Sequence, residues 1–174
     1  MTRKIVQMSF LVTVASILFS IETLIQSPIP GVRLGLANIA TILSLKWWGI
    51  KEALIILLMR VLIGSFLTGR FLQPVFLFSL SGGLVAAVVM GLVMVYGNRV
   101  FSLIGISILG ALFHNLTQIL VAYFLYVRQV EIFFLLPLFI FSSLVTGILI
   151  GFLAYLVCEK IVIDSSIQIT NSIQ

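Results

Sequence analysis

Residues 72–96 read LQPVFLFSLSGGLVAAVVMGLVMVY, a run that contains no charged side chain. A helix needs about 20 mostly apolar residues to cross the hydrocarbon core of a bilayer, which is about 30 Å thick. Similar runs predict five further spans, at about 5–25, 34–48, 51–69, 100–126 and 131–158. We therefore expect an all-α membrane protein, a compact bundle of six transmembrane helices forming one domain over residues 1–160, with a polar cytoplasmic tail over 161–174.

The composition leaves little surface that could face water. Of the 174 residues, 61% are hydrophobic and 9% are charged, and the mean hydropathy is +1.30. A soluble domain of this length needs more polar surface, so a lipid bilayer is the expected environment. The net charge of +5 does not indicate binding to nucleic acid, because the cations are scattered singly and form no basic cluster. A single cysteine, Cys158, allows no disulfide within the chain.

The distribution of Lys and Arg predicts the orientation of the bundle, because cytoplasmic loops carry an excess of cations. With the N-terminus inside, the inner helix ends hold six of them: Arg3, Lys4, Lys46, Lys51, Arg99 and Lys160. The outer loops then hold three: Arg33, Arg70 and Arg128. This bias predicts a multi-pass protein of the cell (cytoplasmic) membrane with its N-terminus and C-terminus inside.

Arg60 is the most unusual residue of the sequence, because it lies near the middle of the span predicted at 51–69. A charge at that depth costs at least about 2.5–3.5 kcal/mol on insertion scales, so it has to face protein or water and needs a partner. Two interpretations stay open. Arg60 either forms an ion pair, for example with Glu22, that locks helices together, or it has a role in substrate binding or coupling.

The span predicted at 100–126 carries a polar stripe. Its members recur every three or four residues and so share one helix face: Ser107, Gly110, His114, Gln118 and Ala122, with Asn115 beside them. The stripe is either a hydrogen-bonded seam between helices, worth about 0.6 kcal/mol per contact on average, or the wall of a binding site. His114 is not expected to bind a metal, because no second His, Cys or Asp stands at ligand spacing.

Further polar residues are predicted near the outer ends of the spans. Glu22 lies late in the first span, Arg33 and Asn38 flank the start of the second, and Arg70 and Gln73 stand where the third meets the fourth. Together with Arg60 and His114 they suggest an outward-facing cavity with excess positive potential, suited to an anionic ligand. The candidate substrate-binding residues are Glu22, Arg33, Asn38, Arg60, His114, Asn115 and Gln118. No catalytic residue, metal or cofactor is expected.

Four ordered segments resemble hallmarks of the Gx transporter family. They read PGVRLGLANI at 30–39, LMRVLIGS at 58–65, SLSGGL at 79–84 and GALFHNLTQ at 110–118. The resemblance extends from about residue 5 to 158, and members are often named heptaprenyl diphosphate synthase component I. It implies a six-helix substrate-binding subunit (S-component) of an energy-coupling factor (ECF) transporter. Its expected partners are a membrane coupling subunit, two cytosolic ATPases and a small-molecule ligand.

The synthase name can be tested against the acidic residues. Prenyl-chain elongation uses Mg²⁺ held by clustered carboxylates, whereas the five acids of this chain are dispersed: Glu22, Glu52, Glu131, Glu159 and Asp164. Neither an aspartate-rich motif nor a Walker A sequence is present. We therefore do not expect the catalytic prenyltransferase. The alternative function that stays open is a non-catalytic membrane subunit in heptaprenyl diphosphate or quinone synthesis, or in flavin–quinone electron transfer.

Overall fold

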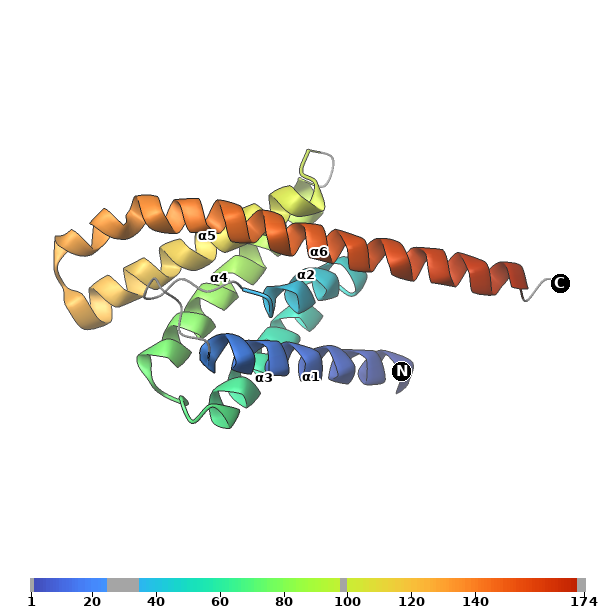
Figure 1. The fold of residues 1–174 in the computed structure, drawn as a ribbon, viewed down its shortest axis with the longest axis horizontal. Coiled ribbons are helices and arrows are strands. Elements are labelled where there is room, and N and C mark those ends of the chain that lie inside the picture. Colours follow the sequence, from blue (N-terminus) through green and yellow to red (C-terminus); the bar gives the residue numbers. More distant parts are fainter. Residues whose placement is uncertain (1, 25–34, 98–99, 172–174) are drawn as a thin grey trace.

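The computed structural model describes residues 2–24, 35–97 and 100–171, with side chains described as far as residue 160. Within these ranges the chain is helical and contains no strand. The elements, shown in Figure 1, are α1 (Thr2–Leu24), α2 (Asn38–Trp47), α3 (Ile50–Leu67), α4 (Pro74–Tyr96), α5 (Leu103–Ala122), the π-helix η1 (Tyr123–Val127), the 3-10 helix η2 (Val130–Leu135) and α6 (Leu136–Asn171).

Six α-helices are present as predicted, but within the described residues only four stretches are long and apolar enough to cross a membrane. These are Thr2–Leu24, Pro74–Tyr96, Leu103–Val127 and Val130–Lys160. The shorter α2 has 10 residues and is therefore only about 15 Å long. The 18 residues of α3 include Lys51, Glu52 and Arg60. The chain is thus a membrane protein, and its length and composition support four of the six expected spans.

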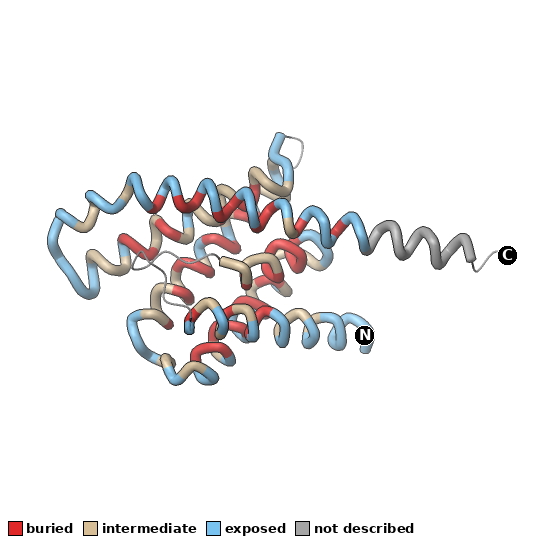
Figure 2. The backbone as a smooth tube through the Cα atoms, viewed as in Figure 1, coloured by how far each residue is buried: buried red, intermediate tan, exposed pale blue. Residues whose placement is uncertain are grey.

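The short helix α2 is enclosed by protein. Its residues from Ala40 to Leu45 are all buried, and it contacts α1, α3, α4 and α6. Figure 2 shows buried backbone concentrated toward the middle of the molecule, whereas the outer faces of α1 and α6 alternate between exposed and buried. Residues 40–45 therefore pack inside the protein, and this explains why a hydropathy pattern predicted a span there.

Small residues bring the helices together at two seams. A Cβ atom added at Gly147 of α6 would lie 2.6 Å from Ile108 Cα, and one at Gly151 would lie 2.7 Å from Ile104 Cα, so α5 and α6 touch backbone to backbone. On α4, a Cβ at Gly83 would lie 3.0 Å from Leu57 of α3. These glycines therefore serve packing within the chain, as small residues commonly do between helices in lipid.

The outward surface is strongly apolar. Large hydrophobic side chains are exposed along several helices, among them Phe10, Phe66, Phe124 and Phe141, each more than 60% exposed. A soluble protein rarely exposes so much contiguous apolar surface, whereas hydrocarbon chains of lipid would cover it. Figure 1 also shows that the beginning of α1 and the end of α6 lie toward the same end of the molecule. At that end Lys4 Nζ of α1 pairs with Glu52 Oε1 of α3 at 2.5 Å.

Candidate functional site

A small polar cavity lies among the six α-helices. Each helix contributes at least one polar side chain to its wall: Glu22, Asn38, Arg60, Ser79, Ser107, His114, Asn115 and Thr146. The cavity has a volume of about 40 Å³, which is room for a few water molecules. Five of the seven candidate residues of the sequence line it, and they come from four different helices: Glu22, Asn38, Arg60, His114 and Asn115.

Arg60 supplies the positive charge of this cavity. Its side chain is 3% exposed, and its Nη2 donates a hydrogen bond of 2.5 Å to Asn38 Oδ1 at the start of α2. The Nε atom is buried and has no hydrogen-bond partner among the described residues. A guanidinium carries five N–H donors in a fixed planar fork, so Arg60 keeps donor capacity that its neighbours do not use.

Glu22 supplies the negative charge and also fixes the beginning of α2. Its carboxylate accepts a hydrogen bond from the Leu36 backbone N–H, and it acts electrostatically on the Arg60 guanidinium. Gly35 has a φ of 73°, in the left-handed region that favours glycine, and this conformation forms the turn leading into α2. The described wall residues of the cavity include one cation, Arg60, and one anion, Glu22.

His114 and Gln118 act as a pair on α5. Gln118 Nε2 lies 2.9 Å from His114 Nε2, as expected for side chains one helical turn apart. With the Gln118 amide donating, Nε2 accepts and the proton of a neutral imidazole lies on Nδ1. Gln118 is buried at 6% exposure but does not line the cavity. Its part in the site is therefore to hold the ring of His114.

Gly82 of α4 shapes the cavity beside His114. A Cβ atom added at Gly82 would lie 2.9 Å from the His114 carbonyl oxygen and 3.0 Å from His114 Nδ1. Any larger residue there would push on the imidazole or on the backbone of α5. Gly82 was not among the candidate residues of the sequence, although it lies within the SLSGGL segment at 79–84.

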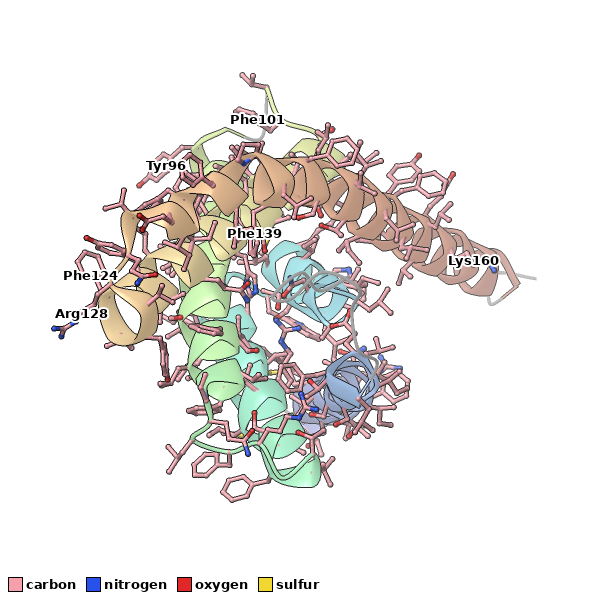
Figure 3. All side chains as sticks on the ribbon, turned by 60° about the vertical axis from the view of Figure 1, so that its left-hand side comes forward. Tyr96, Phe101, Phe124, Arg128, Phe139 and Lys160 are labelled. Atoms are coloured by element: carbon pink, nitrogen blue, oxygen red, sulfur yellow. The ribbon has the colours of Figure 1, made fainter. Side chains whose placement is uncertain are left out.

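Asn115 belongs mainly to the seam between α5 and α6. Its Nδ2 lies 2.8 Å from Ser143 Oγ, 3.3 Å from Ser142 Oγ and 3.3 Å from the Phe139 carbonyl oxygen. Figure 3 labels Phe139 where α6 passes over the bundle. Both interpretations of the polar stripe on α5 therefore apply to part of it. His114 lines the cavity, whereas the Asn115 amide nitrogen belongs to the hydrogen-bonded seam with α6.

Arg70 and Gln73, which the sequence also singled out, lie away from the cavity. Arg33 falls outside the described residues. Arg70 and Gln73 lie in the connection between α3 and α4, where the Arg70 N–H donates to the Ser65 carbonyl at 2.9 Å and Gln73 Nε2 donates to the Gly69 carbonyl at 3.4 Å. Neither of them lines the cavity, so the expectation that they join Arg60 and His114 is wrong.

The sequence was compared with known protein families. The family described as heptaprenyl diphosphate synthase component I matches residues 11–157. The chain belongs to this family. The match covers the residues from α1 through most of α6, including the whole polar cavity. Searches of curated proteins and of solved structures found no match.

The heptaprenyl diphosphate synthase component I name raises the question of Mg²⁺, which prenyl-chain synthesis requires. Among the described residues, no group of three or more His, Cys, Asp or Glu side chains could hold a metal ion. Glu22 is the acid that lines the cavity, and Glu52 is paired with Lys4 at one end of the bundle. This donor set does not fit a metal-dependent prenyl-transfer site, so no catalytic step is assigned to these residues.

Proposed function

We propose that this member of the heptaprenyl diphosphate synthase component I family is the substrate-binding membrane subunit of an ECF-type transporter. Its ligand is a small anionic micronutrient or precursor. The observation that carries the proposal is the Arg60 guanidinium, which is 3% exposed and keeps a buried Nε without a hydrogen-bond partner among the described residues. An arginine that only joined helices would gain most by using all of its donors on protein.

The chemistry around Arg60 favours a carboxylate or a phosphate. Both match the planar fork of a guanidinium and can accept two parallel hydrogen bonds. His114 adds an imidazole to the same cavity, and the serine hydroxyls in its wall can donate or accept. Arg33, in the segment before α2, stays a candidate for the same anion.

A volume of about 40 Å³ is too small for a drug-sized ligand, since pockets for such molecules measure about 300–1,000 Å³. Binding therefore requires the helices around the cavity to separate. The Glu22 carboxylate acts electrostatically on Arg60 and would be repelled by an anionic ligand bound there, and it also accepts the hydrogen bond from the Leu36 N–H. Its displacement would loosen α1 from the start of α2, so that entry of the ligand and opening of the cavity are coupled.

The orientation proposed is N-terminus and C-terminus inside, in the cell membrane, with residues 1–160 as one domain. Lys4 pairs with Glu52 near Lys51 at the start of α3, and Lys46 lies in the last turn of α2 just before it. Figure 3 shows Lys160 and Arg128 at opposite ends of the molecule. The lysine-rich end is the one that the positive-inside rule assigns to the cytoplasm.

The energy for release has to come from partners, because the chain carries no Walker A sequence. The proposed partners are a membrane coupling subunit and two cytosolic ATPases. Gentle affinity purification of the tagged protein from its own membranes, followed by protein mass spectrometry, tests this directly. Recovery of an ATPase pair with a second membrane protein supports the proposal, and repeated recovery of the chain alone contradicts it.

A second candidate function is favoured by the family description itself. In this reading the chain is a non-catalytic membrane subunit of heptaprenyl diphosphate synthesis. The same purification distinguishes it, because the partner recovered would be a soluble prenyltransferase with aspartate-rich motifs. A deletion strain would then lose its long-chain prenyl product, whereas a normal product length in that strain removes this candidate.

A further inference from the structure

A second hollow lies at the lysine-rich end of the bundle and differs completely from the polar cavity. It is an open groove of about 610 Å³ between α1, α2 and α6. Its floor is Leu43, which is 4% exposed, and its sides include Phe10 at 68% and Val157 at 38% exposure. Both tryptophans of the chain, Trp47 and Trp48, also line it. An apolar hollow of this size, open to the surroundings of a membrane protein, fits a hydrocarbon chain.

Cations flank the groove. Lys46 and Trp47 follow Leu43 by three and four residues, so both lie on the Leu43 side of α2. Lys160 follows Val157 by three residues on α6 and therefore shares that face. Both lysines are exposed. The ion pair found among the described residues at this end joins Lys4 to Glu52 instead, which leaves Lys46 and Lys160 available to an anion.

We propose that the groove binds one anionic phospholipid, with an acyl chain against Leu43 and Trp47 and the phosphate at Lys46. Long lysine side chains lie along apolar surface and keep the ammonium at the headgroup level, and tryptophan rings prefer the same interface. Anionic lipids are concentrated in the cytoplasmic leaflet, where each nearby Lys or Arg contributes about 1 kcal/mol. Charge complementarity and the apolar lining thus select the same occupant.

A long-chain prenyl diphosphate has similar amphipathic character, but the groove fits it less well. A diphosphate carries more charge than a phosphodiester and is usually neutralised by a metal held on carboxylates. No carboxylate lines the groove among the described residues, and the nearby Glu52 is paired with Lys4. A helix of a partner protein is the other possible occupant, and it would leave no preference for a lipid headgroup.

The two tryptophans give a direct experiment, because they are the only ones in the chain and both line the groove. The full-length protein is reconstituted in phosphatidylcholine vesicles containing increasing fractions of brominated phosphatidylglycerol or, separately, brominated phosphatidylcholine. Bromine quenches tryptophan fluorescence on contact. We expect half-maximal quenching at a several-fold lower mole fraction of the brominated phosphatidylglycerol. Equal quenching curves for the two lipids overturn the proposal.

Two variants locate the effect. Lys46→Gln should remove the preference for phosphatidylglycerol, whereas Lys51→Gln, which loses the same charge in the first turn of α3, should keep it. If both variants lost the preference for phosphatidylglycerol equally, the preference would come from general attraction to an anionic surface, and the proposed specific site would be overturned. In a final experiment, geranylgeranyl diphosphate competes with the brominated phosphatidylglycerol. If it relieves the quenching at a mole fraction below that of phosphatidylglycerol, the groove binds prenyl diphosphates and the proposal is contradicted.

Discussion

The polar cavity and the apolar groove show how differently two hollows of one membrane protein are built. The cavity measures about 40 Å³, is lined by Arg60, Glu22 and His114, and receives a wall residue from each α-helix. The groove measures about 610 Å³ and is lined almost entirely by apolar side chains of α1, α2 and α6. Lipid can fill an apolar hollow without special placement of residues. Polar and charged side chains inside the bundle cost free energy, so whatever occupies the polar cavity has to form hydrogen bonds or charge interactions with them.

This contrast predicts that Arg60→Leu has the largest effect. The variant should insert and fold, because leucine is favourable in an apolar helix, but it should lose the anionic ligand. Removing one partner of a buried charged hydrogen bond costs about 2–5 kcal/mol, which is roughly 30-fold or more in affinity. Native mass spectrometry of the gently purified protein measures the small molecule that stays bound.

Arg70→Leu is the matched control for that experiment, because Arg70 lies between α3 and α4 and does not line the cavity. It should retain the small molecule as the wild type does. Quenching by lipid in the groove should be the same in both variants. Retention of the ligand by Arg60→Leu would return Arg60 to a purely structural role.

Gly147→Val should have the next largest effect, and it acts on the α5–α6 seam that closes one side of the cavity. A Cβ at this position would lie 2.6 Å from Ile108 Cα, which is backbone and cannot turn aside. Overpacking of this kind typically costs about 1–3 kcal/mol, so the thermal unfolding midpoint in detergent should fall. Val145→Leu, at a 52% exposed site of the same helix, should leave the midpoint unchanged; equal midpoints for all three proteins would contradict this packing.

Gly82→Ala tests the cavity with a smaller change. The added methyl group would lie 2.9 Å from the His114 carbonyl oxygen and 3.0 Å from His114 Nδ1, so the imidazole or the α5 backbone has to shift while the groove stays untouched. We expect ligand retention to fall roughly tenfold, equivalent to about 1.4 kcal/mol, with lipid quenching unaltered. Gly105→Ala is the control, because its Cβ would make an ordinary 3.4 Å contact with Phe101. Similar losses in both variants would show that His114 is not the group affected.

Lys4→Gln should have the smallest effect. It breaks the ion pair with Glu52, but the Lys4 side chain is 45% exposed, and exposed pairs of this kind contribute little. We expect no measurable change in the unfolding midpoint, in ligand retention or in lipid quenching. A clear decrease in the unfolding midpoint, in ligand retention or in lipid quenching would contradict this. It would show that the Lys4–Glu52 pair affects the cavity or the groove, although neither residue lines them.

The sequence predicted much of the cavity because strongly polar side chains are rare and costly within apolar helices. Arg60, His114 and Asn38 stood out for this reason, and the structure brings them together. Ser79 and Thr146 were missed because a hydroxyl in a helix can satisfy itself locally. Ser79 donates to the Val75 carbonyl and Thr146 to the Ser142 carbonyl, each at 2.8 Å. Such residues cost little in lipid and therefore leave no signal in a hydropathy pattern.

The number of spans was harder to predict for a related reason. Hydropathy records that residues 34–48 avoid water, and it does not distinguish lipid from the interior of a protein. In the structure α2 begins only at Asn38, and its central residues Ala40–Leu45 are buried. The turn at Gly35, with its positive φ, shortens the helix. The same turn places the Leu36 N–H beside Glu22 and Asn38 beside Arg60, so the apparent span is part of the candidate site.

The central claim is that the spare donor of Arg60 is reserved for an anionic ligand. An experimental structure of the protein, purified gently in lipid nanodiscs from its own membranes, tests this most directly. We predict non-protein density within hydrogen-bonding distance of Arg60 Nε, an enlarged cavity, and a Glu22 carboxylate moved away from Arg60. An Arg60 whose donors are all taken by protein groups, in a cavity that remains closed and empty of ligand, would contradict the claim.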